Sequence, residues 1–127
     1  MSKRAARAGV FDERGTLLGS ARRDIALYRE AGTIVEQSSD DIWNAVCASV
    51  RSAVASAGID RYTIAGIGFD ATCSLVVLGQ DGAPLPVGAH GDPARNIIVW
   101  INHRATDQAR RITVSRRSAT SASVSSA

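Results

Sequence analysis

Two short apolar runs, each followed at once by small polar or charged residues, constrain this chain more than any other feature. The first is TIAGIGFDATCS at 63–74, and the second is NIIVWINHRA at 96–105. Runs rich in β-branched and aromatic residues fit the pleated surface of a sheet, so we expect a buried strand in each. Ligands of open α/β sheets bind beyond the carboxyl ends of the strands, so the polar residues that follow predict a ligand crevice.

Length and composition predict one folded domain. The 127 residues are 45% hydrophobic, which is enough for a core but small for a two-lobed enzyme. No apolar run approaches the roughly 18 residues that span a membrane, and no apolar segment follows the basic start MSKRAARAG. Cys47 and Cys73 lack metal-type spacing. We therefore expect a cytoplasmic protein with free thiols, no membrane partner, and Cys47 as a small core residue.

The net charge of +3 comes from the two ends of the chain. Seven Lys and Arg residues lie within 3–7 and 110–117, whereas residues 8–109 hold eight basic and all twelve acidic residues. A nucleic-acid-binding face should be basic on the folded body. This body is acidic, so we expect no nucleic-acid partner. An interaction module acting through the basic ends is the alternative, and salt-sensitive retention on nucleic acid would support it.

The first third of the chain predicts a β-hairpin followed by a polar connection. Two strand-like runs, 7–12 and 16–23, flank a tight turn in which Gly15 can supply a positive φ. Residues 24–28 are expected to extend the same sheet. Residues 29–37 are expected to form a polar connection that leads into a helix.

The helix is expected to start at Ser38 or Ser39 and to run to about Ala57. Ser38 with Asp41 approximates a capping box, and Gly58 is a natural stop. Apolar residues recur at spacings of three and four, which predicts one buried face. They are Ile42, Trp43, Val46, Cys47, Val50, Ala53, Val54 and Ala57.

The second half of the chain predicts another hairpin, a loop, a strand and a helix. Asp-Gly at 81–82 lies between the apolar runs 74–79 and 83–88, which indicates a turn. Residues 88–95 form a Gly/Pro loop, 96–100 a second buried strand, and 104–112 the start of a helix. The Ser-rich segment 113–127 is expected to be a disordered tail.

Common nucleotide and metal motifs are absent from the sequence. There is no GxxxxGK[ST] loop, the only lysine is Lys3, and no GxGxxG opens a helix after a strand. No His/Cys group has zinc spacing. His90 and His103 are isolated and are expected to be loop or surface residues.

The polar residues after the two apolar runs each have two interpretations. Asp70 could orient a polyol hydroxyl or cap the next turn, and the cap is favoured. Thr72, Cys73 and Ser74 could contact a sugar or simply suit a tight turn. Trp100 could stack on a sugar or fill the core. Three consecutive polar residues come after Trp100 and Ile101 and favour the pocket interpretation: Asn102, His103 and Arg104.

Three segments together resemble the FGGY carbohydrate kinases, most closely their ribulokinase-like pentulose-kinase group. They are VEQSSDDIW at 35–43, GIGFDATCSLVVL at 66–78 and GDPARNIIVWINHRATDQARRI at 91–112. The resemblance covers roughly residues 7–112 and ends after Ile112. It implies an α/β fold in which residues 1–112 begin the first of two actin-like, ribonuclease-H-like domains. That fold has a mixed sheet, β-hairpins and one main packing helix.

The family transfers the γ-phosphoryl group of ATP to a sugar hydroxyl with Mg²⁺. The resemblance implies a small-molecule sugar partner, a pentulose or polyol, with the segment Ala71 to Ser74 at the pocket and Cys73 and Ser74 as principal contacts. Asp70, directly before this segment, is a further candidate for substrate binding. Trp100 and the residue two positions on would also face the sugar. That position is usually Asp and is Asn102 here, which loses the charge and implies weakened or altered recognition.

The resemblance also implies what this chain lacks. The family's opening Asp-x-Gly-Thr segment, which addresses ATP phosphates and metal, is replaced by SKRAA at 2–6. Its catalytic base and its adenine-binding domain correspond to parts beyond this sequence. We therefore expect no catalytic, cofactor-binding or metal-binding residue here, poor binding of ATP and Mg²⁺, and no kinase activity of the isolated chain. A non-catalytic vestigial sugar-binding or interaction module is the alternative.

Overall fold

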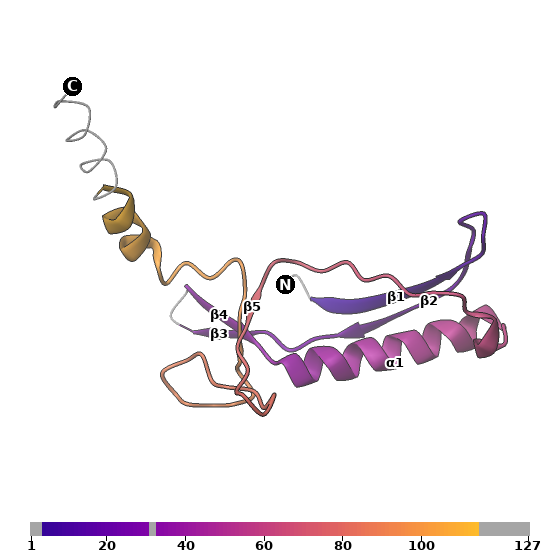
Figure 1. The fold of residues 1–127 in the computed structure, drawn as a ribbon, viewed down its shortest axis with the longest axis horizontal. Helices are drawn as coiled ribbons and strands as arrows, with labels where there is room; N and C mark the ends of the chain where they lie inside the picture. Colours follow the sequence, from indigo (N-terminus) through magenta and orange to yellow (C-terminus); the bar gives the residue numbers. More distant parts are fainter. Residues whose placement is uncertain (1–3, 31–32, 115–127) are drawn as a thin grey trace, which may run out of the picture.

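An antiparallel hairpin opens the fold (Figure 1). The structure, a computed structural model, describes residues 4–30 and 33–114. Strand β1 (Ala5–Phe11) pairs with β2 (Leu17–Asp24). In the turn, Asp12 Oδ1 accepts from the backbone amides of Arg14 and Thr16 at 2.9 and 2.8 Å, and Gly15 has φ of 81°. Only glycine adopts such a φ without strain, so the predicted hairpin and the role of Gly15 are confirmed.

A second antiparallel sheet contains the segments that carry the candidate site. Its strands are β3 (Tyr28–Glu30), β4 (Ile34–Gln37), β5 (Leu75–Val76) and β6 (Ile97–Ile98), in the order β3-β4-β6-β5. The predicted α/β class with hairpins and a main helix is confirmed. The described strands form two antiparallel sheets, whereas the sequence analysis expected one mixed sheet.

Two predictions for the segment between the sheets are wrong. Of residues 24–28, only Asp24 belongs to the first sheet, as the last residue of β2, and Tyr28 already begins β3 of the second sheet. Most of 29–37 belongs to the β3–β4 hairpin and is not a polar connection. The many polar residues of 29–37 suggested a loop. However, Val35 is 2% exposed and Glu36 is 1% exposed, so the strand is buried. Glu36 can lie there because Arg104 pairs with its carboxylate at 2.9 Å, a long-range contact that local sequence does not reveal.

Helix α1 (Ser39–Ala57) has the predicted ends. Ser38 is the N-cap and its Oγ accepts from the amide of Asp41 at 3.2 Å. The carboxylate of Asp41 accepts from the amide of Ala26 at 2.8 Å, so it fastens the helix start to the chain that leaves the first hairpin. Gly58 closes the helix with φ of 64°.

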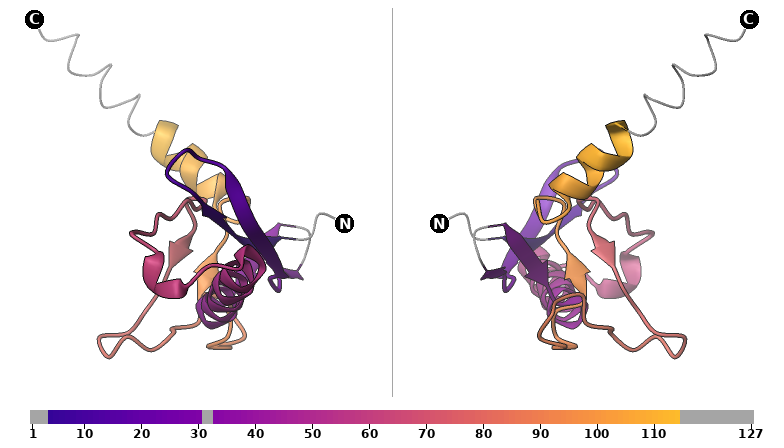
Figure 2. Two further views of the ribbon diagram at one scale, coloured as in Figure 1. Left: turned by 90° about the vertical axis from the view of Figure 1, so that its right-hand side faces the viewer. Right: turned by 90° about the vertical axis from the view of Figure 1, so that its left-hand side faces the viewer.

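Small residues make the contact between α1 and the hairpin, which lie against each other in Figures 1 and 2. Ala45, Ser49 and Ala53 recur every four residues and are buried, and the Ser49 hydroxyl donates to the carbonyl of Ala6 at 3.4 Å. The predicted apolar face is therefore misplaced: Ala53 alone of it is buried, and Trp43 is 63% exposed. Cys47 is only half-buried.

Gly19 on β2 explains why the buried face is made of small residues. A Cβ atom built on Gly19 would lie 2.5 Å from the amide nitrogen of Ala57 and 2.7 Å from the carbonyl oxygen of Ala53. The helix backbone thus lies directly against this position of the strand. Such a close approach leaves room for Ala and Ser but none for larger side chains between the two elements.

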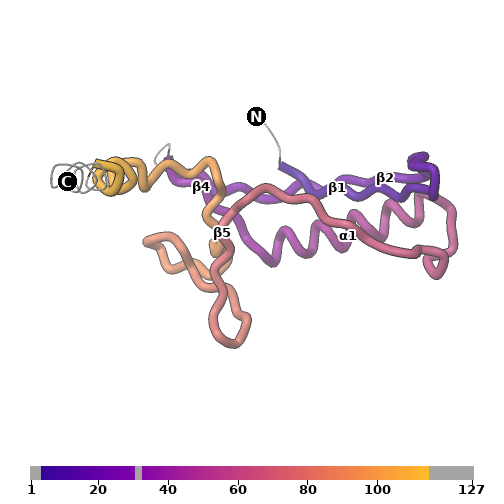
Figure 3. Tube along the Cα trace, turned by 45° about the horizontal axis from the view of Figure 1, so that its top comes forward, coloured from indigo at the N-terminus to yellow at the C-terminus, as the bar shows by residue number. Residues whose placement is uncertain are grey.

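Residues 63–74 are not a buried strand, which corrects the central expectation of the sequence analysis. After a short 3-10 helix (Arg61–Thr63), the chain returns from the end of α1 to β5 as an extended, unpaired segment (Figure 3). Ile67 and Phe69 are 68% and 72% exposed. None of the strand pairs described for residues 4–30 and 33–114 includes this segment. Apolar, β-branched composition alone does not make a strand where no neighbouring backbone is present to pair.

The remaining elements follow the predictions in outline. A bridge between Leu78 and Pro84 extends the β5 region into the predicted second hairpin, with Gly82 at φ of 77°. Strand β6 is shorter than the predicted 96–100. Residues 106–114 are helical and project from the body (Figure 2). The rest of the predicted tail, residues 115–127, lies outside the described residues. No helix within the described ranges is long and apolar enough to cross a membrane.

Candidate functional site

The β5–β6 ladder brings the two predicted polar clusters to one end of a sheet. Leu75 lies opposite Ile98 and Val76 opposite Ile97 in antiparallel register. The residues that precede β5 therefore meet the residues that follow β6. The sequence predicted a crevice beyond the carboxyl ends of two strands. In the structure, residues 70–74 lie before β5 and not after a strand, whereas residues 100–104 do follow β6. The meeting of the clusters depends on antiparallel pairing.

The first cluster is open to solvent. Asp70, Ala71, Thr72 and Cys73 are all exposed, and Ser74 is half-buried. Asp70 makes no side-chain hydrogen bond with another described residue, so it does not cap the following turn. The Oγ of Ser74 is buried and has no partner among the described residues. Buried hydroxyls are normally hydrogen-bonded, so Ser74 keeps capacity for one more contact.

Trp100 lies on the surface and does not fill the core. It is 58% exposed and occupies a turn closed by a hydrogen bond from the amide of Asn102 to the carbonyl of Val99 at 2.8 Å. The guanidinium carbon of Arg4 lies 5.9 Å from the centre of its ring, within the range of a cation–π contact. The core interpretation of Trp100 is wrong, and its contact with a sugar stays a prediction.

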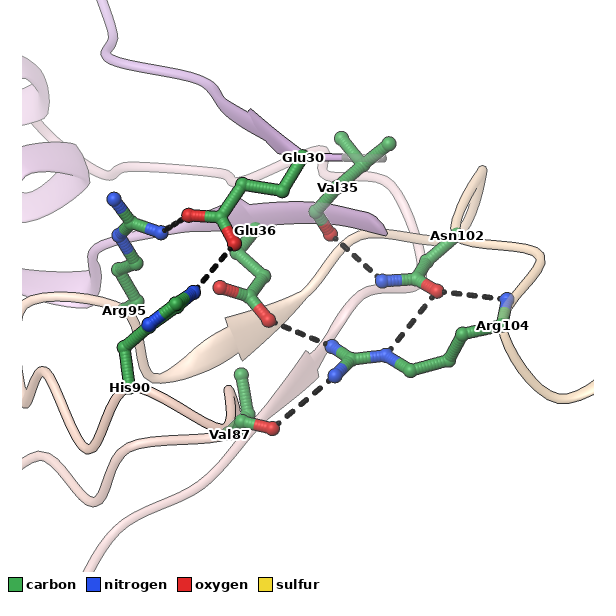
Figure 4. A network of polar contacts seen from close by, with 8 residues as sticks. All are labelled: Glu30, Val35, Glu36, Val87, His90, Arg95, Asn102 and Arg104. Carbon is green, nitrogen blue, oxygen red and sulfur yellow. Dashed lines mark hydrogen bonds and ion pairs between the residues drawn. The ribbon is translucent and has the colours of Figure 1, made fainter. Parts of the chain in front are cut away.

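The polar residues after Trp100 form a connected network with β4 (Figure 4). Asn102 Nδ2 donates to the carbonyl of Val35 at 3.2 Å, and Asn102 Oδ1 accepts from Arg104 N and Nε at 3.1 and 3.3 Å. Arg104 also donates to the carbonyl of Val87 at 3.2 Å and to Glu36 Oε1 at 2.9 Å. These two side chains therefore have protein partners. His103 is exposed, as expected for a surface histidine.

A second ion-pair cluster lies on the neighbouring hairpin (Figure 4). Glu30 Oε2 lies 2.8 Å from His90 Nε2, and Arg95 donates to Glu30 Oε1. The guanidinium of Arg95 is also 4.7 Å from the ring centre of Tyr28. The hydrogen bond from Arg95, followed by that from His90, lowers the pKa of Glu30 below its ordinary 4.5. This cluster ties the loop 88–95 to β3.

We predict that Glu30→Gln makes the free energy of unfolding depend less on pH between neutral pH and about pH 3. Because the folded-state pKa of Glu30 is lowered, its ionised form stabilises the fold above about pH 4.5, and this contribution is lost as pH falls through the folded-state pKa. Urea unfolding from neutral pH down to about pH 3 measures it. Arg95→Met removes the main cause of the lowered pKa of Glu30 and should reduce the pH dependence of the unfolding free energy in the same way. If either variant kept the wild-type decrease in unfolding free energy at acid pH, ionised Glu30 would not be its cause.

Asn96 is a structural residue that sequence reasoning missed. It is fully buried, and its Oδ1 accepts from the amide of Ser39 at 2.9 Å. Its Nδ2 donates to Ser39 Oγ at 2.9 Å and to the carbonyl of Val77 at 3.2 Å. Asn96 lies directly before β6, so its side chain caps α1 from a distant part of the chain and fixes the helix start to the β5–β6 ladder. A single Asn beside an apolar run gives no local signal of this role.

Asn96→Ala should lower the free energy of unfolding by about 2 kcal/mol, because it removes the three hydrogen bonds of a fully buried side chain and leaves the amide of Ser39, in the first turn of α1, without its partner. Asn44→Ala is the matched control: Asn44 is exposed on α1, and its replacement should stay within about 0.5 kcal/mol of the wild type. Urea denaturation followed by circular dichroism compares the two. Equal stabilities for both variants would show that Asn96 is not a cap.

The part of the chain that the structure describes has an apolar groove but no cluster of metal-ligating side chains. Across the described ranges, no group of three or more His, Cys, Asp or Glu residues could hold a metal ion. An open apolar groove of about 610 Å³ lies at the carboxyl end of α1, lined by residues that include Val50, Val54, Ile59 and Ile64. Asn96, which precedes β6, contacts the other end of this 19-residue helix, and the helix is roughly 28 Å long.

The fold is of the α/β class, with polar residues gathered at one end of its second sheet. A sequence profile described as the FGGY family of carbohydrate kinases, N-terminal domain, matches residues 4–124. The chain belongs to the FGGY family of carbohydrate kinases. The match continues past Ile112, where the sequence analysis expected the resemblance to end.

Curated relatives give the same assignment. The chain is 46% identical over 112 residues to a human FGGY carbohydrate kinase domain-containing protein, covering 88% of this chain and 20% of that protein. It is 41% identical to a D-ribulokinase of Saccharomyces cerevisiae, and the match covers 85% of this chain and 15% of that protein. It is 36% identical to a glycerol kinase of Cereibacter sphaeroides, and the match covers 81% of this chain and 19% of that protein. The chain thus spans a fifth or less of the length of these relatives.

Proposed function

We propose that this chain is the sugar-side beginning of an ATP-dependent pentulose kinase that acts on a ketopentose such as ribulose. The observation that carries the proposal is the family match over residues 4–124, together with 41% identity to a D-ribulokinase. The reaction of the whole protein would be transfer of the γ-phosphoryl group of ATP to a sugar hydroxyl.

The contribution of this chain would be one wall of the sugar site. The exposed polar residues before β5 and the exposed ring of Trp100 after β6 lie at the same end of the ladder. An aromatic face can pack on the apolar face of a sugar ring. Ser74 Oγ is buried and has no partner among the described residues, so it would bond a sugar hydroxyl only after a local movement of the segment before β5. Asp70, Thr72 and Cys73 are exposed beside it and could add further hydrogen bonds.

The isolated chain would not catalyse phosphoryl transfer. That reaction requires a positioned metal, contacts to the phosphates and a base acting together. ATP and Mg²⁺ would be held by parts of the protein that correspond to the remaining length of the relatives, of which this chain covers 20% in the human protein. Activity would therefore need a second chain or segment that supplies these parts.

Two measurements on the purified chain test this proposal. Calorimetric titration with ribulose should show weak binding that Trp100→Ala abolishes, and an ADP-release assay with ATP, Mg²⁺ and ribulose should show no turnover. Turnover by the isolated chain would overturn the proposed division of roles. Absence of both binding and turnover would support a vestigial module that no longer binds sugar.

A further inference from the structure

The turn that carries Trp100 is held at both ends by one oxygen atom, the carbonyl of Val35. At the first end, the amide of Val99 donates to this oxygen at 3.1 Å. At the other end, Asn102 Nδ2 donates to it at 3.2 Å. A carbonyl oxygen has two lone pairs and can accept both bonds. Trp100 and Ile101 therefore lie at the centre of a turn that is fixed on β4 by backbone and side chain together.

Both polar atoms of the Asn102 side chain are engaged in this arrangement. Oδ1 accepts twice from Arg104, whose guanidinium continues to Val87 and to the buried Glu36 (Figure 4). A ligand hydroxyl that bonded Asn102 would have to compete with these contacts. By contrast, the ring of Trp100 is 58% exposed. In this turn, the indole is the side chain presented to solvent, and the amide faces the protein.

We propose that Asn102 is a positioning residue that fixes the Trp100 turn on β4 and does not itself contact the sugar. The identity of the ligand rests on the proposed function, whereas the turn geometry does not. This role differs from the direct sugar contact that the resemblance implied for position 102. It also explains why an amide suits this position: a carboxylate would place an oxygen, in place of a donor, 3.2 Å from the carbonyl oxygen of Val35.

The test is the backbone order of the turn, measured by ¹⁵N relaxation on the full 127-residue chain. In the wild type, the amides of Trp100 and Ile101 should have order parameters of about 0.85, and in Asn102→Ala they should fall below about 0.6. Asn102→Asp keeps an acceptor for Arg104 but loses the donor to Val35, so it should show the same loss. Asn44→Ala, on the exposed face of α1, is the matched control and should leave the turn unchanged.

The amides of α1 distinguish a local effect from general unfolding, since they should keep their order in both Asn102 variants. If Asn102→Ala does not fold, the isosteric Asn102→Asp carries the comparison. Order parameters that stay at about 0.85 in the folded variants, or a wild-type turn below about 0.6, would overturn the proposal. A ribulose titration that leaves the Trp100 indole unmoved in the wild type would contradict the proposed function without affecting this result.

Discussion

Gly19→Ala should lower the free energy of unfolding by about 3 kcal/mol, because the new methyl group has no space. Its Cβ would lie 2.5 Å from the amide nitrogen of Ala57 and 2.8 Å from the Cα of the same residue. These are helix backbone atoms, so relief requires α1 to move away from the hairpin. That movement would loosen the contacts of Ala53 and Ser49, which form the buried face of the helix.

Gly66→Ala is the matched control for this prediction. A Cβ at Gly66 meets nothing within 4 Å, and the residue lies in the exposed return segment. Its stability should be unchanged or raised by up to about 1 kcal/mol, since alanine restricts the unfolded chain. Urea unfolding followed by circular dichroism measures both variants. A Gly19→Ala protein as stable as Gly66→Ala would mean that α1 does not lie against β2 as described.

Arg104→Met should cost about 3 kcal/mol of unfolding free energy, because it leaves the carboxylate of Glu36 buried without its cation. The side chain of Glu36 is 2% exposed and that of Arg104 is 29% exposed, so the cost falls mainly on Glu36. The substitution also removes the bonds from Arg104 to Asn102 and to Val87. The strand β4 and the segment after Trp100 would then lose their strongest polar connection.

The double variant Glu36→Gln/Arg104→Met separates the lost ion pair from the lost packing. A neutral amide is cheaper to bury than an unpaired carboxylate, so the double variant should be more stable than Arg104→Met alone. Thermal and urea unfolding of the two variants give the comparison. A double variant that is less stable than Arg104→Met would show that the buried charge is not the main cause of the loss.

Local signals predicted the parts of the fold that local chemistry decides. The turn at Gly15, the cap at Ser38 and the stop at Gly58 each depend on neighbours within a few residues, and the structure shows all three. Long-range contacts decided the rest. Glu36 suggested a polar loop because its partner Arg104 is 68 residues away, and residues 63–74 suggested a strand although no described strand pairs with them.

The candidate site shows the same division. The sequence indicated which residues would gather at one end of the sheet, because polar residues beside apolar runs are visible without a structure. It could not assign their roles. Whether Asn102 faces a ligand or the carbonyl of Val35 depends on how β4 and β6 pair, through Glu36–Ile98 and Gln37–Ile97. The structural role of Asn96 depended on pairing in the same way.

A ribulose titration of the wild-type chain, followed by ¹H–¹⁵N correlation spectra, tests the central claim most directly. We predict that the indole of Trp100 and the amides of Cys73 and Ser74 shift together, because they lie at the same end of the β5–β6 ladder. The amide signals of residues that line the apolar groove, such as Ile59 and Ile64, should not change their chemical shifts. Shifts confined to that groove, or none at Trp100, would contradict a sugar site at this end of the sheet.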